Sequence, residues 1–277
     1  MTALPVVVPP VVGPRVVGER ARRIEDPALL RGKGRYVDDV PMPGAVHAAF
    51  VRSQHAHALV RSIDTKAAEQ VPGVVAIYTG RSIVAALTRL RMPLGFPTKA
   101  LPQDITPFVL ADREVCFVGE PIAIVLADSR YIAEDAAALV EIDYEPLPIL
   151  ADCRDSIVPG SPKVRLDAAS NVLTHYHIAY GEVAKMFASA AHVSKVSLSQ
   201  HRGGAHSIEG RGVLANYSAA DDALTVWSST QMSHDLKFTL ADMLGLAEAR
   251  VRVIAPDVGG GFGAKFMVYP EEVAVAA

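Results

Sequence analysis

The residues best suited to chemistry lie in one glycine-rich stretch, residues 257–266, with the sequence DVGGGFGAKF. Glycine exposes main-chain N–H groups, because no Cβ blocks the approach of a ligand. A stretch of this kind between a strand and a helix is typical of phosphate loops and of dinucleotide-binding turns. It is also typical of turns that only allow two elements to pack closely. The neighbouring residues must distinguish these interpretations.

A phosphate loop of the GxxxxGK[ST] type fits this stretch poorly. Ala264 occupies the position of the last glycine, and Phe266 replaces the hydroxyl residue that would contact magnesium. A dinucleotide fingerprint fits better, since Gly259, Gly261 and Ala264 match GxGxx(G/A). Its acidic partner, expected about 20 positions later, would lie beyond the sequence. Taken alone, the stretch leaves the dinucleotide and close-packing interpretations open.

Three further side chains could contribute to a site. Gln231 ends the strand-like segment TVWSSTQ immediately before a helix-like segment, so its amide would face a cleft or make a strand-end hydrogen bond. Glu209 and Arg211 are two residues apart, which places them on one face of a strand. For this pair the spacing favours a structural ion pair over catalysis.

Histidine and cysteine do not indicate a protein-bound metal. Two histidine pairs share a face on possible strands, but neither has a third ligand at a useful spacing, so we expect solvated or core histidines: His55 with His57, and His175 with His177. Cys116 and Cys153 form no CxxC pair, which excludes an iron–sulfur centre or a cysteine-rich zinc site within the chain. We expect both thiols to be reduced and the protein to be cytoplasmic.

Composition indicates an ordinary globular protein of one large or two modest domains. The 277 residues are 50% hydrophobic and 21% charged, and the formal net charge is -3. No run of Lys or Arg indicates a nucleic-acid partner, and no apolar run of about 18 residues indicates a membrane span. Prolines interrupt the apolar residues at the start of the sequence and no basic segment precedes them, so we expect an extended leader over residues 1–25 rather than a signal peptide. Small molecules are the favoured ligands.

Residues 26–150 predict one α+β domain. Expected strands cover residues 46–51, 74–78, 121–127 and 141–148, and expected helices cover residues 65–70, 82–90 and 129–140. Ser129 is the expected N-cap of the last helix. Residues 92–107 are broken by prolines and predict no regular element.

A linker and a second α/β region follow this domain. Residues 151–173 are rich in Pro, Ser and Asp with weak periodicity, which is typical of a linker. From residue 174 onward we expect a helix over residues 233–244 and strands over residues 174–180, 191–200, 210–218, 224–231 and 250–256. The fold class predicted for the whole chain is α+β.

Several ordered motifs of the second region resemble the molybdenum-binding large subunit of the xanthine dehydrogenase and aldehyde oxidase family, the molybdenum hydroxylases. They are IEGRG, WSSTQ, LGL, VRVIAPDVGGGFGAK and YPEE. Upstream, RRIEDPALLRGKGRYVDDV, VPGVVAIYTG and FVGEPIAIVLADSRYIAEDAAALVEIDYEPLP resemble the α/β hammerhead domain of that family. The resemblance therefore implies a hammerhead domain at 26–150 and an incomplete molybdopterin-binding domain at 174–277.

The resemblance also implies which residues would bind the cofactor. Main-chain amides of Gly260, Gly261 and Gly263, with the ring of Phe262, would lie against the molybdenum centre of molybdopterin. Gln231 would be a further cofactor contact. No direct metal ligand is implied, because the metal of this family is held by the dithiolene sulfurs of the cofactor.

Two departures from the family pattern concern the substrate side. Many members carry a glutamine six residues before the glutamate that matches Glu209, and this sequence has Gly203 there. Gln200 and His206 are the nearby residues that could take its place, but nothing in the sequence requires such a replacement. Purine-oxidising relatives carry a glutamate where this sequence has Phe266, which argues against a xanthine-like substrate. Glu209 and Phe266 are thus the candidate substrate-pocket residues.

The implied activity is the oxidative hydroxylation of an aldehyde or N-heterocycle, with electrons passing to iron–sulfur and FAD partner subunits. The catalytic glutamate of the family would follow residue 277, so we expect no catalytic residue in this chain and no turnover by the chain alone. It would be a fragment, a truncated frame or one part of a split subunit. Two alternatives remain: a non-catalytic assembly or scaffold subunit, and a dinucleotide-binding oxidoreductase fragment.

Overall fold

The computed structural model describes residues 17, 18, 20, 22–94, 101, 105–201 and 203–277. The chain divides into two compact units, Met1–Arg35 and Tyr36–Ala277. The first unit contains α1 (Asp26–Leu29), and there Arg31 Nε donates to the Pro27 carbonyl at 2.8 Å. Most of the expected leader over residues 1–25 lies outside the described residues. In the part of the chain that the structure describes, no helix has the length and apolar character needed to cross a membrane.

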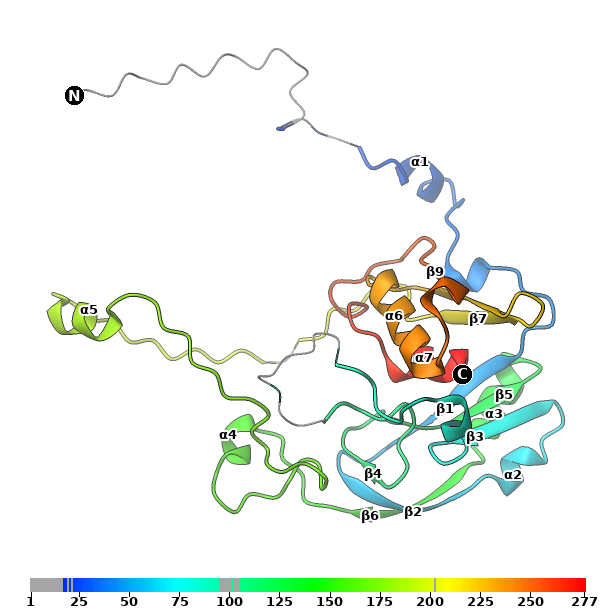
Figure 1. Ribbon diagram of the computed structural model, residues 1–277, viewed down its shortest axis with the longest axis horizontal. Coiled ribbons are helices and arrows are strands. Elements are labelled where there is room, and N and C mark those ends of the chain that lie inside the picture. Colours follow the sequence, from blue (N-terminus) through cyan, green and yellow to red (C-terminus); the bar gives the residue numbers. More distant parts are fainter. Residues whose placement is uncertain (1–16, 19, 21, 95–100, 102–104, 202) are drawn as a thin grey trace. The chain divides into compact units, whose positions relative to one another are not determined.

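Two small antiparallel sheets form the first half of the second unit (Figure 1). One sheet has the order β1-β5-β3, with β1 (His47–Arg52), β5 (Pro121–Ala127) and β3 (Val74–Thr79). The other has the order β4-β2-β6, with β4 (Glu114–Val115), β2 (Ala58–Asp64) and β6 (Glu141–Pro146). The central strand β5 is buried along nearly its whole length, which explains its continuous apolar sequence.

Local capping signals predicted one of the helices in this half well. α3 (Arg130–Ala137) begins after Ser129, whose hydroxyl accepts a hydrogen bond from the Ile132 N–H at 3.3 Å, and this confirms the N-cap. The remaining short helices of this half are η1 (Val37–Asp39), α2 (Lys66–Glu69), η2 (Ile83–Ala86) and α4 (Cys153–Ser156).

The helix expected over residues 82–90 is wrong in length, because only the single turn η2 forms. Leu87 is extended, and Thr88 then donates its N–H to the Met243 carbonyl at 2.8 Å and its hydroxyl to the Asp242 carbonyl at 2.7 Å. These carbonyls belong to the last turn of a later helix, where the Asp242 carbonyl also accepts from the Gly245 N–H at 3.4 Å. The tertiary contact therefore competes with continuation of η2.

The second half of this unit contains a three-stranded sheet of order β7-β8-β9. β7 (Val213–Ser218) and β8 (Ala223–Ser228) are antiparallel, whereas β8 and β9 (Val251–Ile254) are parallel. The crossover between β8 and β9 contains α6 (Ser233–Leu244), whose bounds match the prediction, and η3 (Glu248–Arg250). Because β8 and β9 are parallel, the loops that follow them emerge at the same edge of the sheet.

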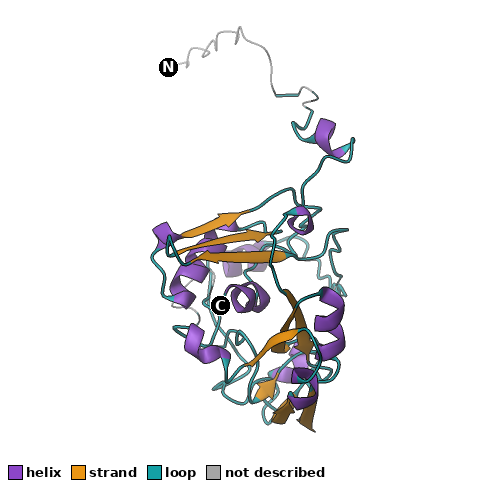
Figure 2. Cartoon of the chain, turned by 90° about the vertical axis from the view of Figure 1, so that its right-hand side faces the viewer, coloured by secondary structure: helices purple, strands orange, loops and turns teal. Residues whose placement is uncertain are grey.

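One hydrophobic core joins the two halves of this unit. Ile83, Met92 and Ile124 of the first half share a cluster with Leu236 and Val273 of the second. The last helix, α7 (Pro270–Ala276), contacts both β7 and β5 and lies between the two sheets that contain these strands (Figure 2). The halves thus fold against each other, and the α+β class is confirmed.

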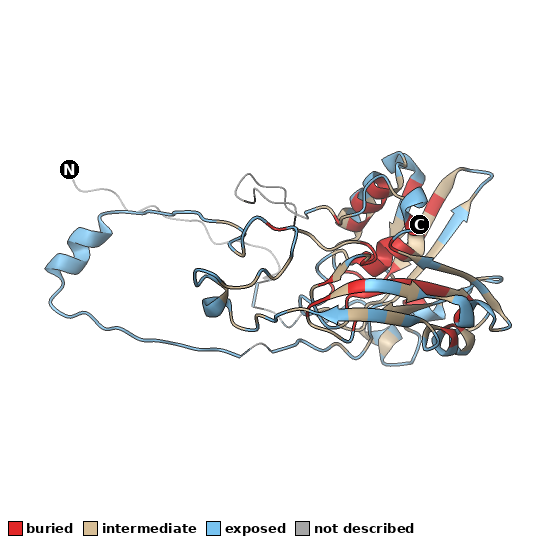
Figure 3. Cartoon of the chain, turned by 90° about the horizontal axis from the view of Figure 1, so that it is seen from below, coloured by how far each residue is buried: buried red, intermediate tan, exposed pale blue. Residues whose placement is uncertain are grey.

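Residues 175–201 are exposed throughout, and the strands expected over residues 174–180 and 191–200 are absent there (Figure 3). Instead, a helix, α5 (Val183–Ser189), interrupts two stretches without regular structure. The alternating pattern is present in the sequence, but a strand needs a hydrogen-bonded neighbour, and the described residues provide none for these stretches. Large apolar side chains are left exposed there: Tyr176, Ile178, Tyr180, Val193, Val196 and Leu198. His175 and His177 are solvated, as expected.

Candidate functional site

The glycine stretch and Gln231 meet at the carboxyl edge of the β8–β9 pair. Gln231 lies shortly after β8, and residues 259–263 follow β9. The Gln231 N–H donates to the Lys265 carbonyl at 2.9 Å, and its side-chain Oε1 accepts from the Gly263 N–H at 3.0 Å. The two loops are therefore held together by the residue that the sequence singled out. Residues 259–263 are called the glycine turn below.

Steric contacts explain why glycine is needed at Gly259, Gly260 and Gly261. At Gly260, whose φ is 100°, a Cβ would lie 2.8 Å from the Phe262 ring and 2.9 Å from the Ser207 Cβ. A Cβ at Gly259 would lie 2.5 Å from the Glu209 Cβ, and a Cβ at Gly261 would lie 2.6 Å from the Gln231 side chain. Real Cβ atoms do not approach neighbours so closely, so these glycines let the turn pack onto these side chains. At Gly263 a Cβ would meet nothing within 4 Å, but its φ of 86° still favours glycine.

Phe262 occupies a backbone conformation that is unusual for an aromatic residue. Its φ is 51°, in the left-handed region, and its side chain is 73% exposed. Such a conformation costs about 1–3 kcal/mol and persists where the surrounding structure enforces it. The turn therefore displays an apolar ring at the surface while its backbone is strained.

Four hydrogen-bond donors of this site have no partner among the described residues. They are the consecutive N–H groups of Gly260, Gly261 and Phe262, and the Nε2 group of Gln231. A run of free main-chain N–H groups in a turn of this kind favours a ligand rich in acceptor atoms or negative charge. This arrangement can bind such a ligand without a cationic side chain.

Glu209 holds the turn from beneath rather than projecting toward a ligand. Its Oε2 accepts from the Gly259 N–H and from Lys265 Nζ, each at 2.7 Å. Lys265 is only 2% exposed, so this ion pair is largely removed from water. The ion pair expected between Glu209 and Arg211 is wrong: residues 209–211 do not form a strand, and Glu209 pairs with Lys265.

Arg211 belongs to a second ionic contact, at the start of α7. Its guanidinium carbon lies 3.6 Å from the centre of the Tyr269 ring, and its Nη2 donates to Glu271 Oε1 at 3.3 Å. Arg52 Nη1, from β1, donates to the same oxygen at 2.6 Å. Burial alone would raise the pKa of Glu271, but the Arg211 charge and the Arg52 hydrogen bond together lower that pKa below its ordinary value.

The other candidate residues have different surroundings. Phe266, three residues after the turn, is 40% exposed and lines a cavity of about 260 Å³. Gln200, Gly203 and His206 are exposed, and within the described ranges no hydrogen bond joins any of them to the glycine turn. The replacement of the family glutamine by Gln200 or His206 therefore has no support from a contact.

The structure also weighs against the dinucleotide interpretation. That fingerprint places its glycines at the N-terminus of a helix, whose N–H groups face the pyrophosphate. Here the residues after Gly263 form turns, and the next helix, α7, begins only at Pro270. The glycines at 259 and 261 are explained instead by packing against Glu209 and Gln231.

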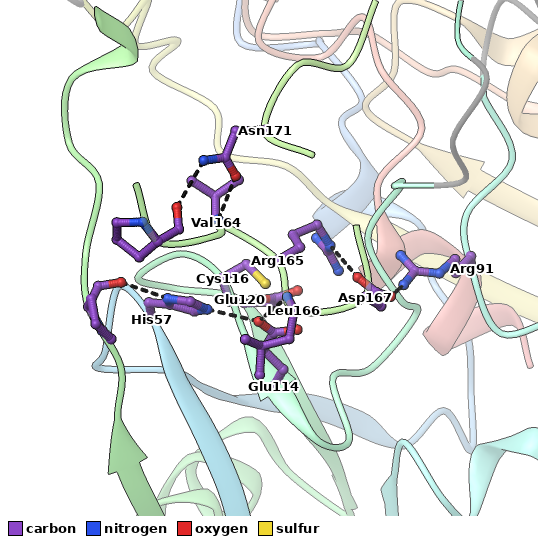
Figure 4. A network of polar contacts seen from close by, with 12 residues as sticks. His57, Arg91, Glu114, Cys116, Glu120, Val164, Arg165, Leu166, Asp167 and Asn171 are labelled. Carbon is purple, nitrogen blue, oxygen red and sulfur yellow. Dashed lines mark hydrogen bonds and ion pairs between the residues drawn. The ribbon is translucent and has the colours of Figure 1, made fainter. Parts of the chain in front are cut away.

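Sequence reasoning missed a buried polar network in the first half of the unit (Figure 4). His57 Nε2 and Glu114 Oε1 are 2.8 Å apart, and the Leu166 N–H donates to the same oxygen at 2.9 Å. His57 Nδ1 also lies 2.8 Å from the Pro148 carbonyl, so His57 is a satisfied core histidine. In the described ranges no group of three or more metal-ligating side chains forms, and this network fastens the loop around residue 166 to the first half.

Glu120 and Cys116 lie in the same buried network. Glu120 is fully buried, its Oε2 accepts from the Cys116 N–H at 2.6 Å, and burial raises the pKa of Glu120. Burial also raises the pKa of the Cys116 thiol to about 12, which keeps it protonated and unreactive. Both Cys116 and Cys153 are free thiols, as expected.

Two family models match consecutive parts of the chain. The hammerhead domain of aldehyde oxidase and xanthine dehydrogenase matches residues 31–148, and the molybdopterin cofactor-binding domain matches residues 165–277. The chain is 39% identical over 267 residues to the nicotine 6-hydroxylase large subunit of Paenarthrobacter nicotinovorans, covering 95% of this chain and 32% of the relative. It is 38% identical over 266 residues to the carbon monoxide dehydrogenase large chain of Afipia carboxidovorans, covering 91% and 32%.

Solved structures show the same similarity. Quinoline 2-oxidoreductase from Pseudomonas putida 86 superposes with a TM-score of 0.80 at 35% identity, over 92% of this chain and 32% of that chain. A carbon monoxide dehydrogenase from Oligotropha carboxidovorans gives a TM-score of 0.82 at 36% identity, over 93% and 33%. The chain thus spans about a third of the length of the relatives it matches.

Proposed function

Because the chain belongs to the xanthine dehydrogenase and aldehyde oxidase family of molybdopterin-dependent oxidoreductases, we propose that its glycine turn forms one wall of a molybdopterin pocket. The observation that carries this proposal is the set of four unpartnered donors on Gly260, Gly261, Phe262 and Gln231. Gly263 supports it, since the space where a side chain would project is open.

The donor set fits the chemistry of this cofactor. Its oxo, sulfur and phosphate groups are acceptors or anions, and all four free groups of the turn donate. Glu209, the carboxylate that contacts the turn, is held by Lys265 and by the Gly259 N–H, which limits its repulsion of an anionic ligand. The chain offers no cluster of metal-ligating side chains among its described residues, so the metal would be held by the cofactor itself.

We propose that the reaction is the oxidative hydroxylation of an aldehyde or an N-heterocycle. When bound, the cofactor supplies the redox chemistry, taking up two electrons from the substrate while water provides the oxygen atom. The residues of this chain would bind and orient the cofactor through the glycine turn and Gln231, and Phe262 would exclude water from one side of it. Relatives that act on nicotine and quinoline support the N-heterocycle class.

Other polypeptide would complete the pocket. Glu209 is engaged in holding the turn, so we assign no catalytic residue to this chain and propose that the catalytic acid–base group lies outside it. The exposed apolar side chains of residues 175–201 support assembly with further protein. We propose that this includes the remaining part of a molybdenum subunit, an iron–sulfur subunit and an FAD subunit, which pass electrons onward.

Cofactor loading of a Gln231→Glu variant tests the proposal. Glutamate keeps an oxygen that can accept from the Gly263 N–H but replaces the Nε2 donor with a negatively charged oxygen. The protein would be produced with its neighbouring gene products in a host that makes molybdopterin, and its molybdenum and pterin contents would be measured. We expect wild type to load near stoichiometry and Gln231→Glu to lose at least about tenfold, equivalent to about 1.4 kcal/mol.

A Gln200→Glu variant is the matched control, because Gln200 is exposed and makes no hydrogen bond to the turn among the described residues. It should load like wild type. Equal loading of Gln231→Glu and Gln200→Glu would contradict the proposed role of the turn. Bound nicotinamide without molybdenum would favour a dinucleotide-binding function instead, and a folded assembly without either cofactor would favour a scaffold.

A further inference from the structure

A groove of about 750 Å³ runs along strand β1, in the first half of the second unit. Five consecutive residues of this strand, 48–52, line the groove, so both faces of β1 border it and the strand edge itself lies against it. Helix α3 borders the groove, and Val140, Ile142 and Tyr144 reach it from β6 and the residue before it. These three residues alternate along the chain, so one face of that segment forms a mainly apolar floor.

The edge of β1 that borders the groove is unpaired. β1 is an edge strand, because its sheet has the order β1-β5-β3. In the part of the chain that the structure describes, the main-chain groups of residues 48–51 make no hydrogen bond except those with β5. Edge strands are normally protected by charged side chains or proline, but residues 48–51 are Ala, Ala, Phe and Val. This edge can therefore accept a further strand through main-chain hydrogen bonds.

A segment that alternates like a strand but lacks a neighbour is present in the same chain, at residues 175–180. It is called the arm segment below. Tyr176, Ile178 and Tyr180 lie on one face of it if it is extended, and they are 69%, 82% and 93% exposed. Among the described residues, the main-chain groups of the arm segment have no hydrogen-bond partner. The unpaired edge and the unpaired segment thus have complementary needs.

The charges of the groove are compatible with an uncharged strand. Arg52 and Arg130 line the groove, and they already pair with Glu271 and Asp38. Glu134, which also lines it, is exposed to solvent. The arm segment contains no Asp, Glu, Lys or Arg. An arm segment could therefore enter without having to neutralise either arginine.

We propose that two copies of this chain associate by exchanging arm segments, each of which adds as a strand to β1 of the other copy. Tyr176, Ile178 and Tyr180 would face the floor of the groove, and main-chain hydrogen bonds to residues 48–51 would set the register. The contact is made twice around a two-fold axis. The other exposed apolar residues of 175–201 take no part in this exchange and stay available for further protein.

The area that a reciprocal exchange covers is sufficient for a stable dimer. An aromatic side chain buries roughly 150–250 Å², so Tyr176 and Tyr180 of two copies would bury roughly 600–1,000 Å². With the groove surface that they cover, the total reaches the roughly 1,200–2,000 Å² of stable protein interfaces. One docked segment would cover about half of this area. A second copy is therefore favoured over a single extended peptide as the occupant.

Analytical ultracentrifugation of the purified chain over a concentration series tests the inference. We expect wild type to dimerise, with slower hydrogen exchange at residues 48–51 in the dimer. Ile178→Asp places a charge against the apolar floor, and Ala48→Lys places a long charged side chain at an exposed position of the β1 edge. Each variant should weaken dimerisation at least about tenfold. A wild-type chain that stays monomeric throughout the series would overturn the inference.

Mixing the two variants separates strand exchange from unspecific association. Ile178→Asp keeps an intact groove, and Ala48→Lys keeps an intact arm segment. The mixture should therefore form a heterodimer through one intact contact, and do so more tightly than either variant forms a homodimer. A mixture that associates no better than the separate variants would contradict the exchange.

Two matched controls carry the same changes at exposed positions outside the groove and the arm segment: Ile157→Asp and Ala219→Lys. Both should dimerise like wild type, and thermal unfolding of all four variants shows whether each is folded. Equal weakening by Ile178→Asp and Ile157→Asp would indicate general apolar association and overturn the inference. Dimerisation needs no cofactor, so its failure leaves the proposed function standing, and failure to load molybdenum leaves the exchange standing.

Discussion

Arg52 Nη1 donates to Glu271 Oε1 at 2.6 Å and so joins strand β1 to helix α7 across 219 residues of sequence. Arg211 approaches the same oxygen from the other side while its guanidinium lies over the Tyr269 ring. One carboxylate therefore ties the first half of the unit to the element that follows the glycine turn. Its charge should matter for the stability of the whole unit.

We expect Glu271→Gln to lower the free energy of unfolding at pH 7 by about 2 kcal/mol, since the acceptor of the Arg52 and Arg211 hydrogen bonds loses its charge. The pKa of Glu271 is lowered in the folded protein, so its ionised form favours folding. This stability is present above the ordinary glutamate pKa of about 4.3 and is lost as pH falls through the lower folded value. Urea unfolding at pH 7 and at acidic pH should show a smaller acid-induced loss for the variant. Glu248→Gln, which removes an exposed carboxylate, is the control. An acid dependence of Glu271→Gln equal to that of this control would contradict the assignment.

Lys265→Met should destabilise the protein by about 3–5 kcal/mol, because it leaves the Glu209 carboxylate beside the turn without its buried partner. The double variant Glu209→Gln with Lys265→Met should lose less than the sum of the single losses, since the two side chains interact directly. Urea unfolding of the four proteins measures the coupling. Lys195→Met, at an exposed position, should change stability by no more than about 0.5 kcal/mol. Strict additivity of the two changes would rule out the pair.

Gly261→Ala should displace either the turn or the Gln231 side chain, because the new Cβ would lie 2.6 Å from Gln231 atoms. Overpacking of this kind costs about 1–3 kcal/mol. We expect reduced molybdenum content together with a lower melting temperature. Gly210→Ala is the matched control, since its Cβ meets nothing within 4 Å and its φ is not positive. Normal cofactor loading by Gly261→Ala would show that the close packing at this glycine is dispensable.

Glu120→Gln should stabilise the protein at pH 8 by about 1–2 kcal/mol, because it removes the charge of a buried carboxylate of which one oxygen has no hydrogen-bond partner among the described residues. The pKa of Glu120 is raised by burial, so its stability contribution is largest at low pH and falls as pH rises through the folded value. Melting temperatures between pH 5 and pH 8 should therefore decline less for the variant than for wild type. Glu141→Gln, exposed on β6, should follow wild type. The positive charge of Arg165 acts on Glu120 and opposes the rise in its pKa. A variant less stable than wild type at pH 8 would mean that attraction to Arg165 outweighs the cost of burying the carboxylate, and would contradict the prediction.

Local signals in the sequence predicted the elements that surround the site. The bounds of α6 follow from its periodicity and from Gly245, which ends the helix in the left-handed region with φ of 67°. The continuous apolar run at residues 121–127 predicted a buried strand, and β5 is indeed buried along nearly its whole length. The glycine stretch was correctly expected between a strand and a helix, although α7 begins farther on than a helix-terminal loop would require.

Other features depend on contacts that spacing cannot reveal. Residues 174–180 and 191–200 alternate like strands, but alternation is a local property and pairing is not. Glu209 lies two residues from Arg211, yet it pairs with Lys265, because folding brings the turn over it. The unpartnered donors at residues 260–262 are likewise a property of backbone geometry rather than of residue type.

At Phe262 the turn exposes an aromatic ring and has a strained backbone, which lowers the stability of the folded protein. Glycine or asparagine would adopt its φ of 51° more easily, so almost any optimisation for stability alone would remove the ring. A screen for thermal tolerance would therefore favour substitutions at residue 262 that relieve the backbone strain and remove the aromatic ring from the turn. Engineering of this protein for robustness should leave residue 262 untouched and seek its improvements elsewhere.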